Sequence, residues 1–159
     1  TINQDYAKGT ELHATHYATF FHRLVQDGHL ILSKPIEAKV TYHDPCYLGR
    51  HAGEYEAPRE LLRAIPGLQL LEMPRNRERS LCCGGGGGGI WLDVPSEERF
   101  SVLRVQEALR TGAEIIATAC PYCTAMLEDA IKNLDVEHAL RVLDIAELVA
   151  QSMTTEAGQ

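Results

Sequence analysis

Five cysteines constrain this chain more than any other feature, because they fall in three groups that are far apart in the sequence. They stand as one single residue, one adjacent pair and one Cys-x-x-Cys pair: Cys46, Cys82, Cys83, Cys120 and Cys123. Adjacent cysteines rarely pair with each other, and an odd number cannot close completely into disulfides. The set therefore favours thiolate ligands of one metal site in a reduced compartment over a secreted, disulfide-stapled domain.

Short apolar runs alternate with helical patterns along the chain, which predicts βαβ units and a parallel sheet. The expected fold class is α/β: roughly four strands in a mainly parallel sheet, helices on both faces, and an N-terminal helix before the sheet. Ser96 and Asp144 are expected to cap two of the helices. We expect strands at residues 39–43, 68–73, 114–118 and 140–143, and helices at 11–27, 57–65, 96–110, 121–133 and 145–152.

The length of 159 residues suits one domain with a proper core. We expect an N-terminal helix and lead-in over residues 1–38, a metal-binding domain over 39–152, and a disordered tail over 153–159. A net charge of −7 argues against nucleic acid as a partner. The sequence shows neither a membrane-length apolar stretch nor a signal peptide, and it begins without Met, so we expect a cytoplasmic fragment of something longer.

Each group of cysteines follows a different predicted strand. Cys46 follows the first strand, the Cys82-Cys83 pair follows the second, and Cys120 and Cys123 follow the third. Parallel strands end at the same edge of a sheet, where ligands usually bind. The sequence therefore predicts that all five thiols converge in one crevice.

The last cysteine pair has the features of a thiolate clamp. Cys120 is expected to be the N-cap of a helix with Pro121 at its first position. The helix dipole at this end would lower the pKa of both Cys120 and Cys123 and favour the metal-binding thiolate. Cys-Pro-Tyr-Cys also matches a glutaredoxin active site, but a dithiol oxidoreductase would not need the other three cysteines.

Six consecutive glycines, Gly84–Gly89, follow the adjacent cysteines directly. Without Cβ atoms, Gly84 and Gly85 are expected to bring backbone amides close to a bulky inorganic ligand. A phosphate cradle is the competing interpretation, but the run lacks the Lys-Ser/Thr of a P-loop. The third interpretation is that the glycine run is a flexible linker.

The residues alone leave the metal open between iron and zinc. Five thiolates exceed the four that a closed structural zinc site needs, and an ordinary cubane iron–sulfur cluster also takes four. A zinc-stabilised structural or docking module would use four of the five cysteines and leave one free. The fifth cysteine favours a less common cluster.

The cysteine pattern resembles the cysteine-rich CCG domain of the heterodisulfide reductase family. Cys46, Cys82-Cys83-Gly84 and Cys120-x-x-Cys123 carry the resemblance, with 35 residues between the first two groups and 36 between the last two. It covers roughly residues 39–150, including the residues around Cys46 (43–50) and Cys120 (119–123). The similarity is greatest to the second, carboxyl-terminal CCG domain of membrane-associated iron–sulfur oxidoreductases.

The resemblance implies a noncubane [4Fe–4S] cluster held by all five cysteines. It further implies an oxidoreductase that reduces a disulfide, or relays electrons between a flavin or thiol donor and a quinone-type acceptor. The implied partners are a second CCG domain, a ferredoxin-like domain, other iron–sulfur or flavin subunits, and a membrane quinone partner. Association with the cytoplasmic membrane would then come through those partners.

Polar residues near the cysteines are candidates for tuning the site. His43, Asp44 and His51 flank Cys46, and they could bond to cluster sulfurs or donate protons to a bound disulfide. The alternative is that Asp44 caps a turn and the histidines are exposed. Arg75, Arg77 and Arg79 could offset an anionic cluster or belong to a solvated loop, and Trp91 could shield the site or belong to the core.

Overall fold

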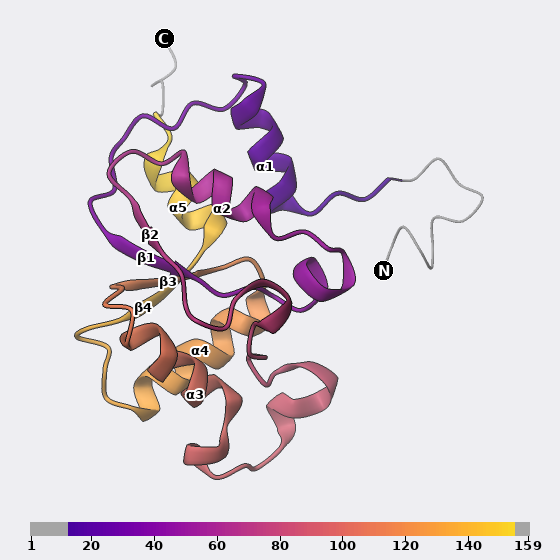
Figure 1. The fold of residues 1–159 in the computed structure, drawn as a ribbon, viewed down its shortest axis with the longest axis vertical. Helices are drawn as coiled ribbons and strands as arrows, with labels where there is room; N and C mark the ends of the chain where they lie inside the picture. The colour runs from indigo at the N-terminus through magenta and orange to yellow at the C-terminus, as the bar shows by residue number, and fades with distance from the viewer. Residues whose placement is uncertain (1–12, 155–159) are drawn as a thin grey trace.

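A four-stranded parallel sheet forms the centre of the computed structural model, which describes residues 13–154 (Figure 1). The strand order is β2-β1-β3-β4, and all three neighbouring pairs are parallel. The strands are β1 (Lys39–Tyr42), β2 (Gln69–Leu71), β3 (Ile115–Thr118) and β4 (Arg141–Asp144). The predicted α/β fold class and the four predicted strands are confirmed.

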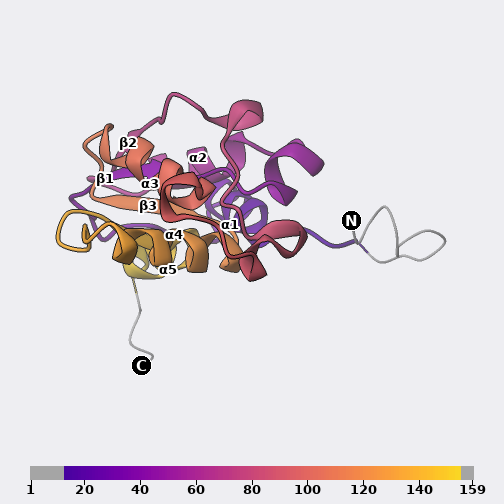
Figure 2. The same ribbon diagram turned by 90° about the horizontal axis from the view of Figure 1, so that it is seen from below.

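Helices cover both faces of the sheet. One face carries α1 (Tyr17–Gln26), α2 (Glu56–Arg63) and α5 (Ile145–Ser152); the other carries α3 (Phe100–Leu109) and α4 (Pro121–Asn133). Figure 2 views the molecule from the α3 and α4 side, with the sheet behind them. Because both faces are covered, β3 is buried along its whole length, as its unbroken apolar run indicated.

Successive residues of β3 point into two different cores. Ile115 and Ala117 pack with Leu61 of α2 and Ile145 of α5, whereas Ile116 packs with Leu127 of α4 on the other face. This alternation follows from the two-residue period of a strand.

Two helices begin later than predicted. Ser96–Glu98 forms a separate 3-10 turn, and α3 starts only at Phe100 because Arg99 is extended (φ −66°, ψ 127°). Its side chain forms an ion pair with Asp129 of α4, and its extended backbone separates the turn from α3. The N-terminal helix starts at Tyr17, with His16 accepting a hydrogen bond from the Ala18 amide as its N-cap.

The remaining predicted boundaries agree within two residues, and Asp144 forms the predicted cap as half of a capping box with Glu147. Residues 11 and 12 of the predicted first helix lie outside the described residues, as do positions 155–159 of the predicted tail. Leu32 forms an antiparallel bridge with Met153, beyond the end of α5.

The order of the strands creates a crevice beside β1. From β1 the chain crosses through α2 to β2 at one edge, and then returns through α3 on the opposite face to β3. The connection that follows β1 runs through α2 to β2, and the connection that follows β3 runs through α4 to β4 in the opposite direction, so a gap opens outside the carboxyl ends of β1 and β3. Such a switch point is where open α/β sheets bind ligands.

Candidate metal centre

The cysteine-bearing loops meet at this switch point. Cys46 follows β1 and leads into a tight turn, Tyr47–His51; Cys120 follows β3 as the N-cap of α4, with Pro121 at the first position as predicted. One small cavity is lined by Cys46, Cys82, Cys83 and Cys123. A second, of about 290 Å³, is lined by Cys46, Cys83, Cys120 and Cys123. All five cysteines are free thiols and border these cavities, so the predicted convergence is confirmed.

The side chains of Cys83, Cys120 and Cys123 interact and shift one another's pKa values. Cys123 donates a hydrogen bond from Sγ to the Sγ of Cys83, 3.3 Å away. This bond, together with His43 and the Gly85 amide, lowers the pKa of Cys83, whereas the neighbouring Cys120 and Cys83 sulfurs, with burial, raise the pKa of Cys123. The side chain of Cys123, with the backbone amides of Cys123 and Tyr122, lowers the pKa of Cys120 to about 6.

The helix terminus therefore acts on its two cysteines in opposite ways. The expectation of a lowered pKa holds for Cys120 but is wrong for Cys123, because Cys123 is the proton donor between two thiolates. Burial raises the pKa of Cys46, and negative charge on Cys82 and Cys83 adds to that shift. The surroundings thus favour the thiolate at Cys83 and Cys120 and the protonated thiol at Cys46 and Cys123, whose protons a metal would displace.

The glycine run forms a folded loop around the second cavity. Gly84 has φ of +84°, which favours glycine, and its amide donates to the Sγ of Cys82 at 3.3 Å. A Cβ on Gly89 would overlap the carbonyl oxygen of Gly84, because the loop turns back on itself there. Gly85, next to Gly84, lines the cavity that the cysteines border. These constraints favour a loop whose backbone approaches an inorganic ligand closely over a flexible linker.

His43 lies completely buried at the carboxyl end of β1. Its Nδ1 accepts a hydrogen bond of 3.1 Å from Nε of Arg104. Its Nε2 is buried without a hydrogen-bond partner among the described residues, and a nitrogen of the ring lies within 4.8 Å of the sulfurs of Cys83 and Cys123. Burial lowers the pKa of His43; the Cys83 sulfur opposes this shift and the charge of Arg104 adds to it.

Asp44 is held by an arginine and does not face a sulfur. Arg59 forms a bidentate pair with it, with N–O distances of 2.6 and 3.0 Å, and also bonds to Glu72 at 2.7 Å. The Arg77 amide donates to the second Asp44 oxygen at 2.9 Å. Asp44 therefore connects the end of β1 to the segment that leads to Cys82.

His51, the third candidate, is exposed and stacks on the ring of Tyr47, with ring centroids 4.8 Å apart. The three candidates therefore have different positions. His43 is buried behind the sulfurs, Asp44 braces the loops, and His51 lies at the surface. Only His43 has a free nitrogen close to a cysteine sulfur.

Two buried arginines brace the cysteine loops, and the sequence interpretation missed both. Arg59 of α2 and Arg104 of α3 are each fully buried, and Arg104 bonds to Glu107 at 2.7 Å as well as to His43. The signal was available: Arg104 stands on the same helix face as the apolar residues Val105 and Ala108, where an exposed charge is not expected.

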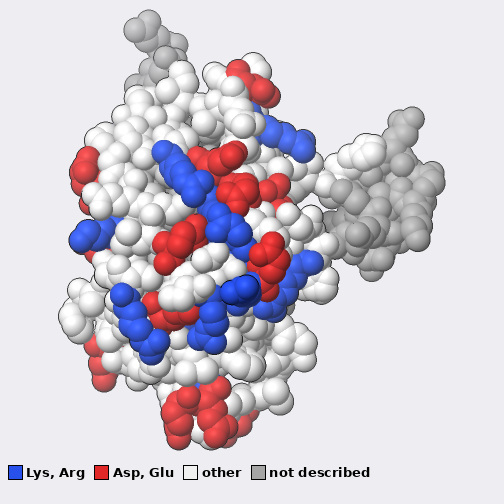
Figure 3. Space-filling model, in the orientation of Figure 1, with Lys and Arg blue, Asp and Glu red and all other residues white. Residues whose placement is uncertain are grey.

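Other arginines near the site have their charge balanced by carboxylates. Arg75 pairs with Glu107 at 3.2 Å, and Arg77 pairs with Glu56 at 2.7 Å. Figure 3 shows basic and acidic side chains interleaved across this face of the molecule. These pairs favour a structural role for both arginines over steering of an anionic substrate.

Three exposed aromatic side chains border the mouth of the second cavity. Tyr47, Trp91 and Tyr122 line it with the cysteines; the first two lie in separate short helical turns and Tyr122 lies in the first turn of α4. Trp91 is 86% exposed, so it does not belong to the core. It belongs to the loop that crosses over the site.

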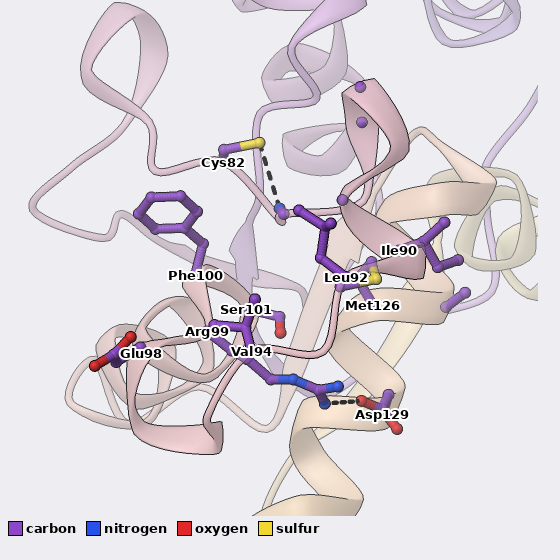
Figure 4. A pocket seen from close by; sticks show the side chains of 15 residues that line it. Cys82, Ile90, Leu92, Val94, Glu98, Arg99, Phe100, Ser101, Met126 and Asp129 are labelled. Carbon is purple, nitrogen blue, oxygen red and sulfur yellow. Dashed lines mark hydrogen bonds and ion pairs between the residues drawn. The ribbon is translucent and has the colours of Figure 1, made fainter.

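A larger pocket of about 610 Å³ opens beside Cys82. Figure 4 shows Cys82 at one end and the ion pair between Arg99 and Asp129, at 2.8 Å, at the other. Most of the wall is apolar and comes from the glycine loop, α3 and α4: Ile90, Leu92, Val94, Phe100 and Met126. The pocket therefore joins an apolar chamber to one of the candidate metal ligands.

The profile of the CCG family, described as a cysteine-rich domain, matches residues 40–128. The chain belongs to this family. The CCG domain is 41% identical over 145 residues to the "Probable iron-sulfur-binding oxidoreductase FadF" of Bacillus subtilis, covering 91% of this chain and 21% of the relative. This chain is also 49% identical over 138 residues to the "Probable membrane-anchored ferredoxin" of Chromohalobacter salexigens, covering 87% of this chain and 20% of that relative.

A third relative is one of the subunits of the dihydromethanophenazine:CoB–CoM heterodisulfide reductase of Methanosarcina barkeri. The identity is 41% over 139 residues, covering 87% of this chain and 33% of that relative. The chain thus spans between a fifth and a third of the length of these relatives. Within residues 13–154, no helix has the length and apolarity needed to cross a bilayer.

The donor set of the CCG domain fits an iron–sulfur cluster better than a single ion. Soft thiolates are the usual ligands of such clusters. Among the described residues, only His43, Cys83 and Cys123 bring ligand atoms within 4.8 Å of one another. The other three cysteines line the same cavities but belong to no such group of three, which suits ligands spread around a multi-atom group better than the four ligands of one zinc ion. None of the three relatives is named for zinc.

Proposed function

We propose that the five cysteines of this CCG domain hold a noncubane [4Fe–4S] cluster and that the domain serves an oxidoreductase of the heterodisulfide reductase type. The observation that carries the proposal is the gathering of five free thiols, from three loops, around two adjoining cavities at the sheet's switch point. The names of the relatives, which include an iron–sulfur-binding oxidoreductase, support the same class of cofactor.

The residues of the chain prepare the site for iron. Cys83 and Cys120 are already biased toward thiolates, and Cys123 holds a proton that binding would release. Cys83 and Cys123 are buried, so the inner side of the site excludes water. Gly84 and Gly85 present the backbone closely because neither carries a Cβ. When bound, the cluster would supply one-electron redox steps.

The reaction we propose is reduction of a disulfide, or relay of electrons between a flavin or thiol donor and a quinone-type acceptor. Two relatives carry names of this kind, the heterodisulfide reductase of Methanosarcina barkeri and an EtfAB:quinone oxidoreductase of Syntrophomonas wolfei. The pocket beside Cys82 offers a route by which a small substrate could reach the cluster. Arg99 and Asp129 neutralise each other at one end of it, and the mostly apolar wall favours an apolar group in the pocket.

We infer that turnover involves further domains or subunits. Two-electron reduction of a disulfide needs a second redox centre beside one that transfers single electrons. A second CCG domain, a ferredoxin-like domain and flavin subunits are the proposed partners, in a cytoplasmic assembly that reaches a membrane quinone through them. The chain's coverage of only a fifth to a third of its relatives is consistent with this arrangement.

Metal analysis of anaerobically prepared protein tests the proposal. We expect about four iron and four sulfide per chain, and an EPR signal that changes on reduction. Cys82→Ser and Cys83→Ser should each lose the signal, whereas Ser33→Ala, far from the site, should retain it. One zinc per chain without sulfide, unchanged by reconstitution with iron and sulfide, would overturn the proposal.

A further inference from the structure

His43 has one ring nitrogen whose purpose the fold does not explain. The side chain is fully buried, its Nδ1 is occupied by Arg104, and its Nε2 has no hydrogen-bond partner among the described residues. An unpaired buried polar atom is costly and is rarely kept without a reason. A ring nitrogen of His43 lies within 4.8 Å of the sulfurs of Cys83 and Cys123. Because Nδ1 faces Arg104, the group that Nε2 would meet is a cysteine sulfur or what the cysteines bind.

Arg104 is held so firmly that it decides which nitrogen of His43 carries the proton. Its Nη1 donates to Glu107 Oε2 at 2.7 Å and to the Arg75 carbonyl at 2.6 Å, and its Nη2 donates to Ser80 Oγ at 3.3 Å. Its Nε then donates to Nδ1 of His43 at 3.1 Å. A guanidinium has only donors, so Nδ1 must be the acceptor and the neutral ring must carry its proton on Nε2.

We propose that Arg104 is a positioning residue that makes His43 a hydrogen-bond donor toward the Cys83 sulfur and thereby prevents it from binding metal. An Nε2 that carries a proton has no lone pair to give a metal ion. His43, Cys83 and Cys123 would otherwise offer three of the four ligands of a zinc site. The inference rests on the proposed cluster and adds a selection against zinc that five cysteines alone do not provide.

The hydrogen bond from His43 to the Cys83 sulfur should also shift the reduction potential of the cluster in a known direction. A hydrogen bond to a ligand sulfur stabilises the more negative, reduced state of an iron–sulfur cluster, and so raises its reduction potential. The buried positive charge of Arg104 acts in the same direction. Removing the donor, or turning it away, should lower the potential.

The position of the His43 proton is the first test. In the full chain labelled with ¹⁵N-histidine and freed of metal, the nitrogen shifts should show Nε2 protonated and Nδ1 unprotonated. His43→Gln identifies the signal among the seven histidines. In the cluster-loaded chain, pulsed EPR should show only the weak coupling of a nitrogen that is hydrogen-bonded to the cluster. An Nδ1-protonated ring, or the strong coupling of an iron-bound nitrogen, would overturn the inference.

Substitution of Arg104 tests the positioning role. Arg104→Leu should lower the cluster's midpoint potential and allow the metal-depleted chain to retain zinc against a chelator that strips the wild type. Arg104→Lys keeps a charged donor and should restore most of both properties. Arg75→Gln is the matched control, because it removes another arginine from Glu107 without touching His43. Equal effects of Arg75→Gln and Arg104→Leu would assign Arg104 a merely structural role.

The outcomes separate this inference from the proposed function. A wild-type chain without iron or sulfide would overturn the cluster, and the ¹⁵N shifts would still report which nitrogen of His43 is protonated. A chain with its cluster but with His43 bound to iron would retain the function and refute the role of Arg104. If Arg104→Leu does not fold, the wild-type shifts and the pulsed EPR measurement decide.

Discussion

The Sγ atoms of Cys123 and Cys83 lie 3.3 Å apart, although 40 residues separate the two cysteines in the chain. The contact joins the first turn of α4 to the start of the glycine loop, and it places a protonated thiol against a thiolate. The metal-free CCG domain thus holds two sulfurs that are close enough to react with each other after small movements.

Oxidation of the metal-free protein should join these two cysteines. We expect diamide, which takes up the two electrons and two protons of a dithiol, to produce a Cys83–Cys123 disulfide as the main product. The Cys83 thiolate is the nucleophile, because its pKa is the one lowered by its neighbours. Mass spectrometry of a proteolytic digest identifies the linked peptides. A glutaredoxin-like site would instead give mainly Cys120–Cys123, and that product would contradict the arrangement described.

Alkylation of Cys120 should depend on pH around a low midpoint. The pKa of Cys120 is lowered to about 6, so its thiolate predominates above that pH and is lost as the pH falls through it. In the metal-free chain, the iodoacetamide rate at Cys120 should fall across pH 7 to 5, whereas an ordinary cysteine titrates near pH ~8.5. Peptide-resolved mass spectrometry provides the rates. A midpoint above 8 would show that Cys123 and the helix amides do not stabilise the thiolate.

Removing Arg59 should destabilise the fold strongly. Arg59→Met leaves the buried Asp44 carboxylate without its bidentate partner, and breaking a buried pair in this way costs about 3–5 kcal/mol. Chemical denaturation of the chain measures the change in unfolding free energy. Arg99→Ala is the control, since its pair with the exposed Asp129 should be worth no more than about 1 kcal/mol. Equal losses in both variants would contradict the bracing role of Arg59.

Filling the pocket beside Cys82 should slow electron transfer to small acceptors without loss of iron. Ala125 lines this pocket, so Ala125→Trp would occupy it; Ala139→Trp, before β4 at the opposite edge of the sheet, is the control. We expect reoxidation of the reduced protein by a small disulfide or quinone to slow about tenfold, or ~1.4 kcal/mol. Stopped-flow absorbance follows the reaction. An unchanged rate with full iron content would place the electron route elsewhere.

Local patterns were sufficient for most of the fold. The apolar run before Thr118 predicted a buried strand, and Cys120 followed by Pro121 predicted where α4 begins. The start of α3 was predicted wrongly, because Ser96 opens only a single 3-10 turn and the extended backbone of Arg99 separates this turn from α3. The local pattern at Ser96 does not reveal this break, where the side chain of Arg99 pairs with Asp129, 30 positions later.

By itself, the sequence determined the family, the parallel α/β class and the convergence of the cysteine groups, because strand periodicity and the carboxyl ends of parallel strands obey short-range rules. Only the tertiary structure decided which thiols share protons, and that Arg59 and Arg104 stand buried behind Asp44 and His43. Those properties depend on burial and on distances between residues far apart in the chain. No pattern of residue types specifies which buried charge will meet which partner.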